Sequence, residues 1–224
     1  MTDRIHFETL GCRLNHDETE GAARFFSNAG FSIDMEILTS ASPPSPETVL
    51  AVINTCTVTG KAEQKARRLI RLMLARLPAA LIVVTGCYAD MDASAIRSID
   101  PGRISIIPGT AKYILSLLPR AMQEGGPLSL QEGRFRHELL DAFIRQSLAD
   151  SVPGAVFGGK KRTPVNAFLL YTNVFEKHSR ASIKIQDGCN SGRDRREAFA
   201  CCCRACWMRR SRSFFGFQAS ILKA

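Results

Sequence analysis

Three cysteines in the first half of the chain stand directly after apolar runs. Cys12, Cys56 and Cys87 close the segments "TLGC", "INTC" and "VTGC". The runs before Cys56 and Cys87 are continuous and rich in Val and Ile, which is typical of strands buried on both faces of a parallel sheet. The carboxyl ends of parallel strands lie along one edge of the sheet, where α/β proteins build their sites. The three thiols are therefore expected to form one site.

This arrangement favours a metal site over simple burial. One free cysteine would mean little, because free cysteine is among the most buried residue types. Three at equivalent strand ends, with sulfurs within about 7 Å of one another, suit an iron–sulfur cluster with one open iron. Zinc is the alternative, although structural zinc takes a fourth protein ligand. Gly11 and Gly86, directly before two of the cysteines, would let the backbone approach a bulky ligand closely.

The elements that must position these thiols alternate between strand and helix. Strands are expected over 4–10, 31–37, 48–55, 80–86 and 103–109, and helices over 16–29, 60–76, 92–99 and from Thr110. That alternation predicts an α/β fold, a parallel sheet with flanking helices.

Two groups of polar residues near these elements have open roles. Asn15, Asn54 and Thr55 flank the cysteines and can either hydrogen-bond cluster sulfurs or cap turns. The basic run "KARRLIRLMLAR" can contact a phosphate backbone, but a solvated helix face is the more common reason for such a run.

Composition favours a globular, cytoplasmic protein. A chain of 224 residues, 45% hydrophobic, can bury one good core and part of a second. No apolar run approaches the roughly 20 residues of a membrane span. No signal-peptide core follows the first residues, and without an export signal a disulfide framework is disfavoured. Residues 193–224 supply +6 of the formal charge of +9, so the rest of the chain gives only weak support for a nucleic-acid partner.

The segments that carry the cysteines resemble a known family. "FETLGCRLNHDETEG", "VINTCTVTGKAEQKARRLIR" and "VVTGCYAD" are similar to the amino-terminal domain of the radical S-adenosylmethionine methylthiotransferases. "GCRLN" with "NTCTVTGKAEQK" is most similar to the subgroup that acts on threonylcarbamoyladenosine of tRNA. The resemblance covers about residues 4–120 and resumes at "RASIKIQDGCN", residues 180–190.

The resemblance implies an enzyme that adds a methylthio group to C2 of N6-threonylcarbamoyladenosine in tRNA. Cys12, Cys56 and Cys87 would hold an auxiliary [4Fe–4S] cluster whose open iron carries the transferred sulfur. A second domain, a partial (β/α) barrel, would bind another [4Fe–4S] cluster through C-x3-C-x2-C and cleave S-adenosylmethionine to a 5′-deoxyadenosyl radical. A carboxy-terminal β-domain would help to hold the tRNA.

The chain departs from this pattern after Cys189, the first cysteine of the expected cofactor-binding motif. The family spacing would place cysteines at 193 and 196, where the chain has Arg193 and Arg196. Residues 1–120 are therefore expected to form the amino-terminal α/β domain, 121–178 a connecting segment, and 179–224 an incomplete start of the barrel. After about Asn190 we expect an out-of-frame or otherwise aberrant ending.

This departure leads to expectations about activity. We expect the chain to lack the second cluster, S-adenosylmethionine binding and the tRNA-binding domain, to perform no radical chemistry, and to be poorly packed after about residue 120. Two alternatives stay open. Cys189, Cys203 and Cys206 can close together around iron or zinc. The chain is either a working methylthiotransferase or a non-catalytic iron–sulfur-binding domain or inactive fragment of one.

Overall fold

The computed structural model describes residues 3–56, 60–123, 126, 128 and 136–150. The predictions made for Cys189, for the start of the barrel and for the tail lie outside the described residues.

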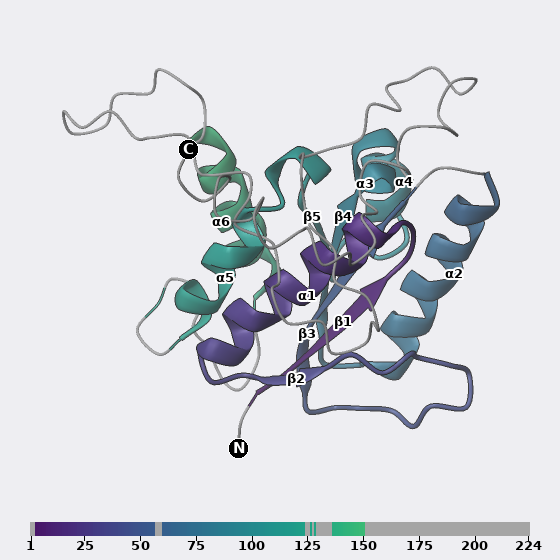
Figure 1. Cartoon of the computed structure of the whole chain (residues 1–224), viewed down its shortest axis with the longest axis horizontal. Helices are drawn as coiled ribbons and strands as arrows, with labels where there is room; N and C mark the ends of the chain where they lie inside the picture. Colours follow the sequence, from purple (N-terminus) through teal and green to yellow (C-terminus); the bar gives the residue numbers. More distant parts are fainter. Residues whose placement is uncertain (1–2, 57–59, 124–125, 127, 129–135, 151–224) are drawn as a thin grey trace, which may run out of the picture.

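A five-stranded sheet forms the centre of the described part (Figure 1). Its strands are β1 (Arg4–Thr9), β2 (Ser32–Asp34), β3 (Thr48–Thr55), β4 (Leu81–Gly86) and β5 (Ile104–Ile106). They lie in the order β2-β1-β3-β4-β5, and every neighbouring pair is parallel. All residues of β3 and β4 are buried, as expected for central strands covered on both faces. The predicted α/β fold is confirmed.

Helices cover both faces of this sheet. They are α1 (Arg13–Asn28), α2 (Gly60–Arg76), α3 (Cys87–Met91), α4 (Ala93–Arg97), the 3-10 turn η1 (Gly109–Ala111), α5 (Ile114–Met122) and α6 (His137–Ala149). Alternate residues of β3 point to opposite faces. Leu50 and Val52 pack in one core with α1, α5 and α6, whereas Ala51 and Ile53 pack in a second core with α2, α3 and α4. None of the helices in the described ranges is long and apolar enough to cross a bilayer.

The element boundaries differ from the prediction where a cysteine follows a strand. α1 begins at Arg13, directly after Cys12, rather than near residue 16. α3 begins at Cys87 itself, and Asp92 separates it from α4 and caps α4 by accepting a hydrogen bond from the backbone N–H of Ala95. Cys56 and Cys87 therefore follow their strands directly, whereas Leu10 and Gly11 separate Cys12 from the end of β1.

α6 corrects the prediction that the chain is poorly packed after about residue 120. Its side chains Leu140 and Ile144 are buried in the core shared with α1 and α5. The Tyr113 hydroxyl donates a hydrogen bond to the carbonyl of Ser147, and His137 Nε2 lies 3.0 Å from the carbonyl of Ile104. The prediction is wrong for this helix, because it buries an apolar stripe against the domain.

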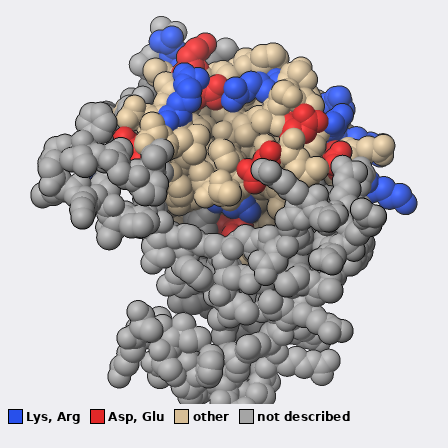
Figure 2. Space-filling view, turned by 90° about the horizontal axis from the view of Figure 1, so that it is seen from above, with Lys and Arg blue, Asp and Glu red and all other residues tan. Residues whose placement is uncertain are grey.

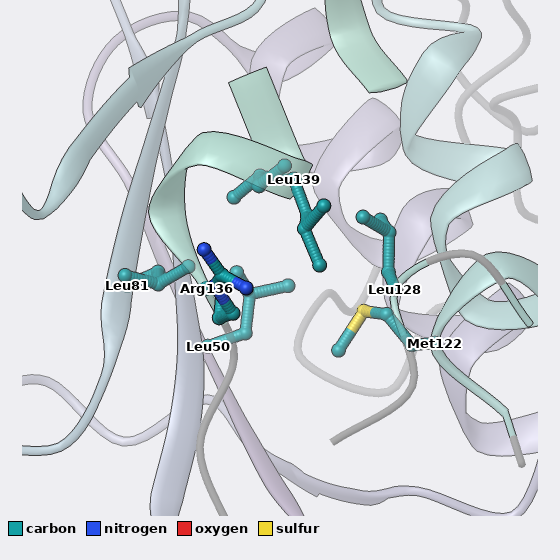
Figure 3. Close-up of a pocket in the computed structure, with 7 residues that line it drawn as sticks. Leu50, Leu81, Met122, Leu128, Arg136 and Leu139 are labelled. Atoms are coloured by element: carbon teal, nitrogen blue, oxygen red, sulfur yellow. The ribbon is translucent and has the colours of Figure 1, made fainter. Parts of the chain in front are cut away.

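A small, mostly apolar pocket lies beneath the start of α6 (Figure 3). It is lined by Leu50, Leu81, Met122, Leu128, Arg136, Leu139 and Leu140. Leu50 and Leu81 belong to the amino-terminal halves of β3 and β4, so this pocket lies at the opposite end of those strands from Cys56 and Cys87.

A buried histidine links β1 to β2. His6 is fully buried, its Nδ1 lies 2.9 Å from Asp34 Oδ2, and its Nε2 lies 3.8 Å from Glu8 Oε1. Burial lowers the pKa of His6, but the carboxylates of Glu8 and Asp34 outweigh the burial, and the net shift of the pKa is upward. Folding therefore favours the protonated imidazolium.

We expect this histidine to make stability depend on pH. Its contribution to the free energy of unfolding is fully present below the unfolded pKa of about 6.5 and is lost as pH rises through the raised folded pKa. Urea unfolding between about pH 5.5 and about pH 8.5 should show the wild type losing more stability than His6→Gln. Parallel profiles for the two proteins would contradict this assignment.

Candidate functional site

The three cysteines lie at the carboxyl ends of three adjacent strands, β1, β3 and β4. The register pairs Thr55 with Gly86, so Cys56 and Cys87 follow paired residues on neighbouring strands. Thr9 of β1 pairs with Asn54 of β3, which brings the turn that carries Cys12 to the same edge. Figure 1 shows β1 running directly into the turn that begins α1, at the edge where α3 begins.

Two of the thiols are in direct contact. A hydrogen bond between Cys56 and Cys87, together with burial, raises the pKa of Cys87 well above its usual range. Cys12 is near enough for its charge to act in the same direction, whereas the Lys112 ammonium opposes the rise. Cys56 is buried, and Cys12 and Cys87 are partly exposed. The Cys87 thiol therefore favours its protonated form, and metal binding at this residue would release the proton.

Within the described part of the chain, no three Cys, His, Asp or Glu side chains are grouped as ligands of a metal ion. The predicted sulfur separation of about 7 Å for a shared cluster therefore stays a prediction. The donor chemistry of the edge is that of thiols, which are soft ligands suited to iron–sulfur clusters or zinc.

Two glycines allow the strand ends to approach one another. Gly11 has φ +127° and Gly86 has φ +95°, which are backbone conformations that residues with a side chain rarely adopt. A Cβ at Gly11 would lie 2.3 Å from Cys56 Cβ and 3.3 Å from Cys56 Sγ. A Cβ at Gly86 would lie 2.1 Å from the carbonyl oxygen of Thr55. Any larger residue at either position would push the cysteine-bearing segments apart.

Asn15 ties two of these segments together. Its Nδ2 donates to the carbonyls of Leu10, before Cys12, and Thr55, before Cys56, both at 3.2 Å. Its Oδ1 lies 3.9 Å from Cys12 Sγ and accepts a weak hydrogen bond from that thiol. Asn15 therefore fixes the turn and also contacts the Cys12 sulfur, whereas a hydrogen bond to a cluster sulfur stays a prediction.

The side chains of Asn54 and Thr55 donate hydrogen bonds to backbone carbonyls rather than to a cysteine sulfur. Asn54 Nδ2 donates to the carbonyl of Asn15 at 3.0 Å, and Thr55 Oγ1 donates to the carbonyl of Thr85 at 2.6 Å. Asn54 Oδ1 is buried without a hydrogen-bond partner among the described residues, and a Cβ at Gly86 would lie 2.7 Å from it.

Lys112 is a residue of this site that the sequence analysis missed. It follows β5 and η1, and its Nζ lies 2.6 Å from Glu18 Oε2 and 3.5 Å from Asn15 Oδ1. The side chains of Lys112 and Glu18 are only 12% and 7% exposed. A sequence signal existed, because Lys112 follows another strand that ends at the same edge. Its partner Glu18 is 94 residues away in the sequence, so the ion pair between the two side chains could not be predicted.

Comparison with known proteins agrees with the fold. Residues 4–107 match the uncharacterized protein family UPF0004. The chain is 41% identical to threonylcarbamoyladenosine tRNA methylthiotransferase MtaB of Treponema pallidum, over 84% of this chain and 44% of that protein. It is 31% identical to MtaB of Bacillus subtilis, over 84% of this chain and 34% of that protein.

A relative named for another substrate is also similar. The tRNA-2-methylthio-N(6)-dimethylallyladenosine synthase of Nitratidesulfovibrio vulgaris is 31% identical, over 87% of this chain and 43% of that protein. The chain thus spans less than half the length of these relatives. With the parallel α/β fold and the three cysteines near the strand ends, these similarities support assignment of the chain to the MtaB-like methylthiotransferase family.

Proposed function

We propose that Cys12, Cys56 and Cys87 hold an auxiliary [4Fe–4S] cluster. The observation that carries the proposal is the contact between the Cys56 and Cys87 thiols at paired strand ends, with Cys12 close enough to influence Cys87 electrostatically. Each thiolate would bind one iron, and the fourth iron, without a protein ligand, would supply an open position for the sulfur to be transferred. Gly11 and Gly86 support this assignment, because side chains there would occupy the space around Cys56 and Thr55.

We further propose that the protein acts in the addition of a methylthio group to C2 of N6-threonylcarbamoyladenosine in tRNA. Relatives named for this substrate include the one at 41% identity, whereas the dimethylallyladenosine synthase is 31% identical. S-adenosylmethionine and a second [4Fe–4S] cluster belong to this proposal for the whole enzyme. Cys189 is the one residue of this chain proposed for that cofactor site, and it lies outside the described residues.

The exposed face of α2 supports tRNA as the partner. Lys61, Lys65, Arg68 and Arg71 are all exposed on this helix, and none forms an ion pair with another described residue. Figure 2 shows Lys and Arg side chains projecting from the right-hand edge, where Figure 1 places α2. α2 begins at Gly60, soon after Cys56, so the amino-terminal end of this basic face is the part nearest to Cys56 along the chain, and a phosphate backbone bound at the cysteine edge would run along it.

The test of this function is the nucleoside content of tRNA. Cells from which the gene is deleted should lose 2-methylthio-N6-threonylcarbamoyladenosine and accumulate N6-threonylcarbamoyladenosine, as measured by mass spectrometry of digested tRNA. The methylthio derivative of isopentenyladenosine in the same digest is the internal control and should not change. Loss of that derivative instead would assign the protein to the other substrate. An unchanged profile would favour a non-catalytic iron–sulfur-binding domain or inactive fragment.

A further inference from the structure

A nearly buried lysine lies beside the three thiols. Lys112 Nζ is 3.5 Å from Asn15 Oδ1, and the same oxygen is 3.9 Å from Cys12 Sγ. Only 12% of the Lys112 side chain is exposed. Burying an ammonium group is costly unless an opposite charge compensates it, so the position of Lys112 requires an explanation.

Glu18 explains only part of this placement. Its carboxylate lies 2.6 Å from Lys112 Nζ, is 7% exposed, and holds the ammonium in place from α1. An ion pair between these two groups could form equally well at the surface, where neither group would lose its hydration. Lys112 Nζ also lies near Asn15, whose side chain hydrogen-bonds Leu10, Thr55 and the Cys12 thiol. This position places the positive charge at the edge of the sheet that carries the cysteines.

A bound cluster would place several negative charges at this edge. Three thiolates and the sulfides of a [4Fe–4S] cluster carry net negative charge, and one-electron reduction adds another. In a partly buried site this charge is poorly screened by solvent, so a fixed cation within a few ångströms stabilises the more negative state. Nearby charge and hydrogen bonding are among the features that set the reduction potential of such clusters.

We propose that Lys112, positioned by Glu18 and Asn15, supplies the positive charge that offsets the bound cluster and raises its reduction potential. Lys112 is a positioning residue in this proposal, since it acts on the cluster through charge rather than as a ligand. The proposal rests on the assignment of the cluster to Cys12, Cys56 and Cys87.

The experiment uses the full chain, reconstituted anaerobically with iron and sulfide. The variants are Lys112→Met, Lys112→Arg and Glu18→Gln, with Arg120→Met, at an exposed position in the last turn of α5, as the matched control. Iron content and visible absorbance report whether the cluster is present, and a redox titration gives its potential. Neither readout requires enzymatic activity.

The expected shifts have opposite signs. Lys112→Met should disfavour the reduced cluster by about tenfold, which lowers the potential by about 59 mV for a one-electron couple. Lys112→Arg should stay near the wild type because it keeps the charge. Glu18→Gln should raise the potential, since the positive charge of Lys112 is then no longer neutralised. Arg120→Met should match the wild type.

The outcomes separate this inference from the function on which it rests. If the wild type retains no iron, the cluster assignment fails and the inference fails with it. If the wild type holds a cluster whose potential does not change in Lys112→Met, the cluster assignment stands and the inference is wrong. Equal downward shifts in Lys112→Met and Glu18→Gln would show a structural effect of the salt bridge and would also overturn the inference.

Discussion

Cys56→Ala should retain almost no iron after anaerobic reconstitution, at least about tenfold less than the wild type. Cys56 is the central residue of the proposed site, because β3 lies between β1 and β4 and its thiol hydrogen-bonds that of Cys87. Removing it leaves Cys12 and Cys87 on non-adjacent strands. Two thiolates do not satisfy a cluster that needs three protein ligands.

The measurement is iron and sulfide content with the visible absorbance of the reconstituted protein. Cys202→Ala is the control, since Cys202 belongs to neither set of proposed ligands. Far-ultraviolet circular dichroism of the metal-free variants establishes that both fold like the wild type. Equal iron retention by Cys56→Ala and Cys202→Ala would reject Cys56 as a ligand. Zinc uptake by the wild type without sulfide-dependent absorbance would favour the zinc alternative.

The sheet and the location of the cysteines could be predicted because the sequence signals are strong there. Continuous apolar runs over β3 and β4 predict buried parallel strands, and the cysteines follow those runs directly. The start of α1 could not be placed as well. Asn15 lies in the first turn of this helix, but its side chain also joins Leu10 to Thr55, a tertiary role without a local signature.

Other features were missed for different reasons. Lys112 and Glu18 come together only because η1 and α1 meet above the same sheet edge, and no local pattern pairs residues so far apart. α6 did have a signal, since Leu140 and Ile144 are four residues apart and both buried. The prediction of poor packing was based on the unusual tail but was applied to all residues after about 120. It therefore wrongly included this amphipathic segment.

Gly86→Ala should lower the free energy of unfolding by about 3 kcal/mol. Gly86 joins β4 to α3 with φ +95°, so a side chain there strains the backbone. The added Cβ would also lie 2.1 Å from the Thr55 carbonyl oxygen and 2.8 Å from the Thr55 backbone nitrogen. These are atoms of the neighbouring strand, which can relieve the clash only if β3 and β4 separate directly before Cys56 and Cys87.

Two other glycines separate the free-energy cost of backbone strain from that of the steric clash. Gly30 has φ +93° but nothing within 4 Å of an added Cβ, so Gly30→Ala measures the backbone strain alone, about 1 kcal/mol. Gly102→Ala has neither strain nor a close neighbour, its nearest atom lying 3.7 Å away, and should stay within about 0.5 kcal/mol of the wild type. Urea unfolding of the three variants gives the comparison. If Gly86→Ala costs no more than Gly30→Ala, the strand ends are not held in close contact, and the convergence of Cys56 and Cys87 loses its physical basis.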